Sequence, residues 1–250
     1  MKNLRIQFWI SLVGMLLTSA FWIFDIANVP PLFADWRWAA LACFLIYSAA
    51  MWWQLWTYRE EFYSNIPNIQ FVEWEIIPNV GMRRTRPSQL SPSGQYSATE
   101  YGIFFKVVFA NNPKRRTPEN TANNVSARVT FYDSEEHLII GPIFGRWSDS
   151  DEPKTSIDIP RLINANILSN GTPRKLDLFM KFPDDEFCYA YNNDSYFFEN
   201  WRHINYKLTP DRFFIHVKLI GERVEKDFWF TAHNKDKGHH IQITPGKNAT

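Results

Sequence analysis

Two long runs without a charged residue, 6–24 and 38–58, restrict this chain more than any other feature. They contain nineteen and twenty-one residues, and an α-helix needs roughly 20 apolar residues to cross about 30 Å of hydrocarbon. Tryptophan and tyrosine, which favour the headgroup layer, lie near the ends of both runs. These residues are Trp9, Trp22, Trp36, Trp38, Trp52, Trp53, Trp56 and Tyr58. The sequence therefore predicts two N-terminal transmembrane helices, at about 6–24 and 38–58.

The segment between the two runs carries Pro30 and Pro31. Proline cannot continue a helix, because it lacks an N–H and its ring clashes with the preceding turn. A short turn is therefore expected between the helices. Residues 1–59 are predicted to form a two-helix transmembrane hairpin, with the lipid bilayer as its first partner.

The flanking charges predict the orientation of this hairpin. Lys2 and Arg5 precede the first run and Arg59 follows the second, whereas the segment between them holds one Arg and two Asp. Cytoplasmic flanks of membrane helices carry an excess of Lys and Arg. We expect a multi-pass protein of the cell inner (plasma) membrane with both termini cytoplasmic. The glycosylation sequons at Asn124, Asn170, Asn193 and Asn248 are then coincidental.

A cleavable signal peptide is the alternative interpretation of the first run. Lys2 and Arg5 precede a short apolar stretch, and Thr18-Ser19-Ala20 resembles a cleavage site. The apolar run continues to Phe24, which favours a retained helix. If the first run were cleaved, the second would act as a stop-transfer segment, and the C-terminal domain would still be cytoplasmic.

Beyond residue 59 the hydrophobic period changes to two, which is typical of half-buried strands. The predicted buried faces are Val72, Trp74 and Ile76; Ile103, Phe105, Val107 and Phe109; Val125, Ala127, Val129 and Phe131; Leu176, Leu178, Met180 and Phe182; Phe213, Ile215, Val217 and Leu219; and Phe228 with Phe230. A strand around Leu138 and a turn at Gly221 complete the pattern. Residues 60–250 are predicted to form one soluble all-β domain, a sandwich or a barrel, with a flexible tail from about residue 234.

Two segments resemble a known family. Residues 105–112 end a strand in Ala-Asn-Asn, and residues 122–133 open the next with Ala-Asn-Asn-Val. This strand pair resembles the prokaryotic immunoglobulin-like domains of the CARDB type, found in adhesion and cell-surface proteins. The resemblance implies an Ig-like β-sandwich and does not specify a ligand. The extracellular setting usual for such domains conflicts with the cytoplasmic orientation deduced from the flanking charges.

The charge balance limits the possible partners. The chain has 27 basic and 26 acidic residues, a formal net charge of +1, so general nucleic-acid binding is not expected. We find no nucleophile elbow, phosphate-binding glycine loop or zinc-protease motif, and the chain is not expected to be an enzyme. The histidines His233, His239 and His240 lack metal-ligand spacing, so no metal or cofactor is expected.

The candidate binding residues are Lys114, Arg115 and Arg116, in the connection between two predicted strands. If the first strand leads away from the membrane, the second returns and delivers this loop to the membrane-proximal end. Clustered cations there can bind anionic lipid or a nucleotide phosphate, although an ordinary solvated loop is the simpler interpretation. The long connections 81–100, 111–123 and 183–209 are the expected binding edges, and 86–97 is expected to be disordered.

These expectations combine into one functional hypothesis and two alternatives. The chain is predicted to be a membrane-tethered, non-enzymatic binding or interaction module that displays an Ig-like domain and binds a protein or other ligand at the inner membrane surface. In the first alternative it is a membrane effector, in which the β domain senses a ligand such as a cyclic nucleotide and the helices disrupt the bilayer. That alternative resembles small antiphage effectors in architecture only. In the second, the hairpin assembles a homo-oligomer with a purely structural role.

Overall fold

The computed structural model describes residues 34–81, 101–182, 185–198, 201–235 and 241–246, with only the backbone path given for 34–41, 43, 78–81 and 101. The chain divides into two compact units, Met1–Ser64 and Asn65–Thr250, and each is described by itself. The predicted helix at 6–24, the connection 82–100 and the histidines at 239 and 240 lie outside the described residues.

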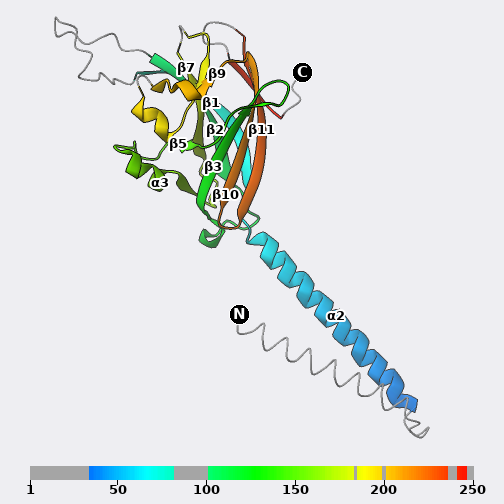
Figure 1. Cartoon of the computed structure of the whole chain (residues 1–250). Coiled ribbons are helices and arrows are strands. Elements are labelled where there is room, and N and C mark those ends of the chain that lie inside the picture. Colours follow the sequence, from blue (N-terminus) through cyan, green and yellow to red (C-terminus); the bar gives the residue numbers. More distant parts are fainter. Residues whose placement is uncertain (1–33, 82–100, 183–184, 199–200, 236–240, 247–250) are drawn as a thin grey trace, which may run out of the picture. The chain divides into compact units, whose positions relative to one another are not determined.

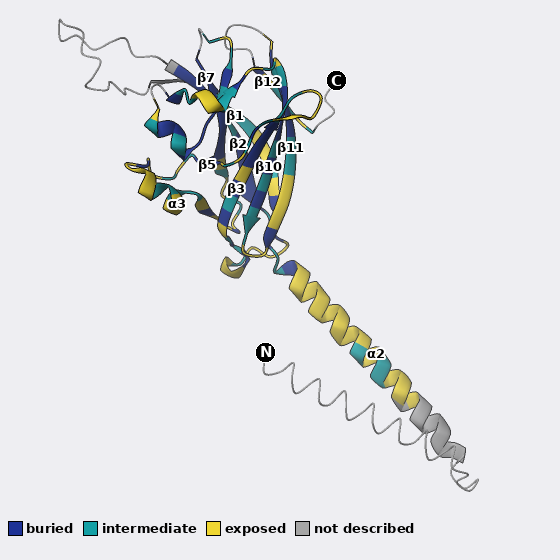
Figure 2. Cartoon of the chain, in the orientation of Figure 1, coloured by how far each residue is buried: buried dark blue, intermediate teal, exposed yellow. Residues whose placement is uncertain are grey.

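The first unit contains helix α2 (Ala34–Ser64), which includes the predicted segment 38–58. Its apolar residues are not confined to one face of the helix. Large apolar side chains are exposed along it (Figure 2): Phe44, Leu45, Ile46, Trp52, Trp53, Leu55, Trp56, Tyr58, Phe62 and Tyr63. Among the described residues, no helix combines the length and the hydropathy that a membrane crossing requires.

The second unit consists of two antiparallel sheets (Figure 1). Within the described residues, sheet A contains β1 (Ile69–Gly81), β2 (Tyr101–Asn111), β5 (Arg146–Trp147), β7 (Arg174–Lys181), β8 (Cys188–Ala190) and β9 (Lys207–Leu208). Sheet B contains β3 (Ala122–Tyr132), β4 (Leu138–Phe144), β6 (Asn164–Ile167), β10 (Arg212–Gly221), β11 (Val224–Asn234) and β12 (Ile241–Pro245). The connections include η3 (Pro118–Asn120), η4 (Ser156–Asp158), α3 (Ile159–Leu162), η5 (Asn193–Phe197) and η7 (Ile204–Tyr206). The predicted all-β, sandwich-like fold is confirmed.

The strand order differs from the order along the chain. Sheet A runs β1-β2-β7-β8-β9, with β5 also beside β7, and sheet B runs β12-β11-β10-β3-β4, with β6 also beside β3. The chain therefore crosses between the sheets after β2 and returns later to place β7 beside β2. In the β1–β2 pair, Ile69 lies opposite Asn111, so the start of β1 and the end of β2 share one end of the sandwich.

The main core lies between the two sheets. The predicted faces of β2, β3 and β10 are confirmed, because all their members are buried there. Phe105 stacks on Phe179 with ring centroids 4.5 Å apart, and Phe179 meets Phe213 edge to face at 5.4 Å. At one side, Phe71 and Trp74 of β1 contact Phe230 of β11 at 5.3 and 4.5 Å. Aromatic side chains thus link the two sheets in addition to filling the space between them.

The predicted face of β1 was correct for Trp74 and wrong for Val72 and Ile76. Val72 and Ile76 are both 48% exposed, whereas Phe71 and Trp74 pack against the core. The pairing with β2 shifts between Phe71 and Glu73. Val72 is the extra residue of this bulge, so Phe71 and Trp74 lie on the same face. Ile76 pairs regularly opposite Phe105, and its exposure is that of a side chain on the edge strand of sheet A.

The predicted face of β7 was wrong for its second half. Leu176 and Leu178 lie in the main core, but Met180 and Phe182 belong to a second cluster. A register shift in the β2–β7 pair explains the change of face. The second cluster also contains Phe104, Tyr191, Tyr196 and Trp201.

The connection 183–209 supplies much of this second cluster. Its described residues form β8, η5, η7 and β9, and they pack Tyr191, Tyr196 and Trp201 against sheet A. The connection 183–209, which was expected to be a binding edge, is in its described part a folded layer that packs against sheet A. The tail prediction was also wrong in part, because β12 pairs with β11 and buries Ile241.

Candidate functional site

The β2–β3 connection, residues 112–121, lies at the end of the sandwich where the domain begins. Asn68, just before β1, exchanges backbone and side-chain hydrogen bonds with the end of β2. The backbone N–H of Asn112 donates to the carbonyl oxygen of Asn68 at 2.9 Å, and Nδ2 of Asn68 donates to the carbonyl oxygen of Asn112 at 3.1 Å. We call residues 112–121, together with the β10–β11 turn at Glu222 and Arg223, the basic tip.

Two fully buried asparagines, Asn111 and Asn120, connect the basic tip to neighbouring segments by hydrogen bonds. Oδ1 of Asn111 accepts from the backbone N–H of Asn68 at 2.8 Å, and its Nδ2 donates to the carbonyl oxygens of Asn120 at 2.8 Å and Ile167 at 3.1 Å. Nδ2 of Asn120 donates to the carbonyl oxygen of Arg115 at 2.7 Å. These hydrogen bonds give partners to backbone groups around residues 112–121 and so order the loop. From the sequence alone, the loop was interpreted as an ordinary solvated loop.

The three predicted binding residues, Lys114, Arg115 and Arg116, are adjacent and exposed on this ordered loop. Within the described part of the chain, none of them forms an ion pair. Nη2 of Arg116 donates a long hydrogen bond, 3.3 Å, to Oδ1 of Asn112. The three charges therefore face solvent.

The basic tip also contains a cation that the sequence did not single out. Arg223, in the β10–β11 turn, has a left-handed φ of 60°. Its Nη1 donates to the carbonyl oxygen of Asn65 at 3.1 Å, and its Nη2 donates to the carbonyl oxygen of Glu119. Arg223 thus ties the first residue of the domain to the loop. The only local sequence signal was its place in the turn after Gly221.

Two carboxylates belong to the basic tip. Glu119 is exposed, and hydrogen bonds from its own backbone N–H and from the Thr117 side chain lower its pKa. Glu222 accepts a hydrogen bond from Nδ2 of Asn124 at 2.8 Å. Four basic side chains against these two carboxylates leave the basic tip with a positive excess.

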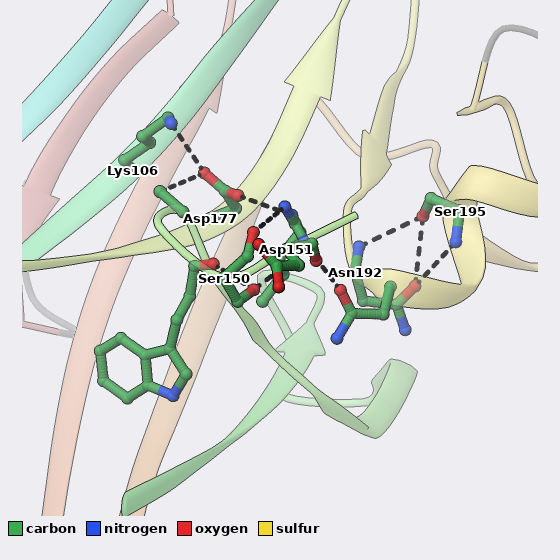
Figure 3. A network of polar contacts seen from close by, with 10 residues as sticks. Lys106, Ser150, Asp151, Asp177, Asn192 and Ser195 are labelled. Carbon is green, nitrogen blue, oxygen red and sulfur yellow. Dashed lines mark hydrogen bonds and ion pairs between the residues drawn. The ribbon is translucent and has the colours of Figure 1, made fainter. Parts of the chain in front are cut away.

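A second polar constellation is buried inside the domain (Figure 3). Asp177 of β7 lies 3.1 Å from Nζ of Lys106 on β2, and its Oδ1 accepts from the Ser148 hydroxyl at 2.7 Å. Burial raises the pKa of the Asp177 carboxyl, while the charge of Lys106 opposes that rise. Nε of Arg146 approaches the same carboxylate at 3.7 Å.

Arg146 is itself fully engaged. Its Nη1 donates to Oδ1 of Asn193 at 2.7 Å, to the Ser150 hydroxyl at 3.1 Å and to the carbonyl oxygen of Asp151 at 3.0 Å. Its guanidinium also lies 4.8 Å from the centre of the Tyr196 ring. This network joins sheet A to the connection 183–209, so its role is to stabilise the fold. Sequence reasoning missed it, because its members lie far apart along the chain.

The remaining sequence candidates are not brought together. His233 lies on β11 at the end opposite the β10–β11 turn, and the other two histidines lie outside the described residues. Among the described residues, no group of acidic, histidine or cysteine side chains has the arrangement of a metal site.

Comparison with family models, with curated proteins and with solved structures found no match to this chain.

Proposed function

We propose that this protein is a membrane-tethered, non-enzymatic interaction module whose Ig-like domain faces the cytoplasm at the inner membrane surface. The two N-terminal hydrophobic segments act as the tether. The domain presents its surface to a protein partner or to a second copy of the chain. The observation that carries this proposal is the exposed apolar surface of α2.

Contact between water and the apolar side chains exposed on α2 is energetically unfavourable. Phe44, Leu45 and Ile46 are consecutive and exposed, and because successive helical residues point about 100° apart, they face different sides. A helix that is apolar all round is normally buried in protein or in a membrane. The uncharged run 38–58 and its flanking aromatic residues favour the membrane.

One observation supports the cytoplasmic orientation, and a second argues against a compartment with N-glycosylation. The first is the excess of Lys and Arg on the flanks of the hydrophobic segments. The second is the sequon at Asn193, because this side chain is only 3% exposed and accepts a hydrogen bond from Arg146 at 2.7 Å. A glycan attached there before folding would prevent this packing, so the domain is suited to a compartment without N-glycosylation.

The strand order supports the Ig-like assignment. An Ig domain places strands A, B, E and D in one sheet and G, F and C in the other. Here β1, β2, β7 and β5 follow the first order, and β11, β10 and β3 follow the second. The other described strands, β4, β6, β8, β9 and β12, are then additions to these seven.

We propose no catalytic role for the buried polar groups. Asp177 is enclosed by two cations and a hydroxyl that serve the packing of sheet A. Cys188 is fully buried, and burial raises the pKa of its thiol to about 12, so it is a poor nucleophile.

Fractionation of cells tests the tether. The full chain is expected to stay in the membrane pellet after alkaline carbonate washing and to require detergent for release. A matched fragment, residues 65–250, is expected in the soluble fraction with the far-ultraviolet circular dichroism of a β protein. Release of the full chain by carbonate alone, without detergent, would reject the proposal.

A further inference from the structure

We infer that the basic tip binds anionic phospholipid headgroups at the membrane surface beside the tether. This inference rests on the proposed function, because it requires the domain to be held at a bilayer. It adds a specific ligand class and a specific set of residues, Lys114, Arg115 and Arg116, to that proposal.

Chain connectivity brings the basic tip to the bilayer. Asn65 immediately follows the last residue of α2, and its carbonyl oxygen is held by Arg223 of the basic tip at 3.1 Å. Asn68, three residues later, is fastened to Asn111 and Asn112 of the same region. The basic tip therefore contacts the first residues of the domain, which follow α2 directly along the chain.

The cations of the basic tip are available for an external anion. Lys114, Arg115 and Arg116 are exposed, and they form no ion pair within the described residues. The guanidinium of Arg223 instead donates hydrogen bonds to the carbonyl oxygens of Asn65 and Glu119. The three exposed side chains thus carry the binding, and Arg223 positions the loop that bears them.

The fixed backbone of the loop favours binding. Because Asn111 and Asn120 already hold the chain around Arg115, contact with an anion orders only side chains and requires no loop folding. Charge-assisted hydrogen bonds from Arg and Lys to phosphate oxygens are stronger than neutral ones. Each exposed cation near an anionic surface strengthens attachment about fivefold.

The shape of the site favours a lipid surface over a free nucleotide. Small-molecule sites are concave and enclose most of the ligand. Lys114, Arg115 and Arg116 instead project from an exposed loop, which matches an extended layer of headgroups.

The opposite end of the domain provides an internal control. Lys235 is exposed and follows the last residue of β11, whereas the first residue, Val224, adjoins the basic tip. A strand rises about 3.3 Å per residue, and β11 has 11 residues. Lys235 is therefore separated from the basic tip by several times the roughly 8 Å screening length of physiological salt.

Amine labelling of the full chain in nanodiscs tests the inference. The protein is reconstituted in phosphatidylcholine alone or with about a third of phosphatidylglycerol, and the acylation rates of Lys114 and Lys235 are read by mass spectrometry. Anionic lipid is expected to slow the labelling of Lys114 at least about fivefold, and high salt is expected to reverse this effect. The rate at Lys235 is expected to stay the same in both lipids.

A pair of single-charge variants makes the test specific. Arg115→Gln is expected to weaken the protection of Lys114, and the matched variant Lys235→Gln is expected to leave it unchanged. Equal weakening by the two variants would mean that total charge governs protection, and would overturn the assignment to the basic tip.

The remaining outcomes separate this inference from the proposed function. Equal Lys114 labelling in both lipids, with the chain incorporated in the discs, overturns the lipid site and leaves the tether intact. Failure to incorporate in either lipid overturns both. Protection of Lys114 by millimolar inorganic phosphate in neutral discs, with none from anionic lipid, would replace the lipid by a free phosphate ligand.

Discussion

Oδ1 of Asn111 accepts a hydrogen bond of 2.8 Å from the backbone N–H of Asn68, and so joins the end of β2 to the segment that enters β1. The same side chain donates to the carbonyl oxygens of Asn120 and Ile167. One buried amide therefore fixes three chain segments around the basic tip. The exposed cations depend for their position on a residue that carries no charge.

Replacement of Asn111 tests this role. Asn111→Ala leaves buried backbone groups without partners, and is expected to lower the free energy of unfolding by about 1–3 kcal/mol. Amide hydrogen exchange in residues 112–121 should accelerate as the loop loses its constraint. Asn164→Ala is the matched control, because Asn164 is exposed on β6, and it should change neither quantity. Unchanged exchange in Asn111→Ala would show that other contacts hold the loop.

The ion pair between Lys106 and Asp177 leads to a second prediction. Asp177→Ala leaves the buried Arg146 and the partly buried Lys106 without their carboxylate, and is expected to cost about 3–5 kcal/mol in denaturant unfolding. The control is Asp227→Ala, which removes an exposed partner of His216, 2.8 Å away, and should cost at most about 1 kcal/mol. Similar losses in both variants would contradict a central role for the buried network.

Cys188 should be chemically inert in the folded protein. Its thiol pKa is raised by burial from 9.0 to about 12, so at pH 8 only about one thiol in ten thousand is ionised. In a Cys43→Ser background, alkylation at pH 8 is expected only after denaturant is added. The contribution of this thiol to stability is present below pH 9 and is lost as the pH rises from 9 to about 12. Rapid alkylation of the folded protein would show that the site opens.

Dye release from liposomes separates the interaction module from the membrane effector. Reconstituted full-length protein is expected to leave the vesicles sealed, with and without cyclic nucleotides. Nucleotide-dependent leakage would instead favour the effector. If the double variant Arg115→Gln, Arg116→Gln lost this nucleotide-dependent leakage and Lys235→Gln kept it, nucleotide sensing would be assigned to the basic tip.

Hydrophobic alternation predicted the strands whose buried face contains no extra residue. Phe105, Val129 and Val217 were placed correctly because β2, β3 and β10 keep a period of two through the core. The predictions for Val72 of β1 and for the second half of β7 failed where the pairing of these strands shifts, because a bulge is set by the partner strand and leaves no reliable mark in the local sequence.

The candidate site was predicted only in part. The position of Lys114, Arg115 and Arg116 beside the start of β1 follows from two antiparallel strands, which alternation made visible. The roles of Asn111 and Arg223 depend on contacts with residues distant in sequence, such as Asn68 and Asn65. Periodicity contains no information on such contacts. The second cluster was missed for the same reason, because Tyr191 and Trp201 lie in a connection without a repeating pattern.

Protease accessibility of a tag at the C-terminus tests the central claim most directly. We expect the tag to be protected in intact cells and to be cleaved once the inner membrane is permeabilised, with the protein in the membrane pellet in both cases. Cleavage in intact cells whose outer barrier alone is opened would place the domain on the other side of the membrane. That result, or recovery of the full chain as a monodisperse species without detergent, would contradict the account.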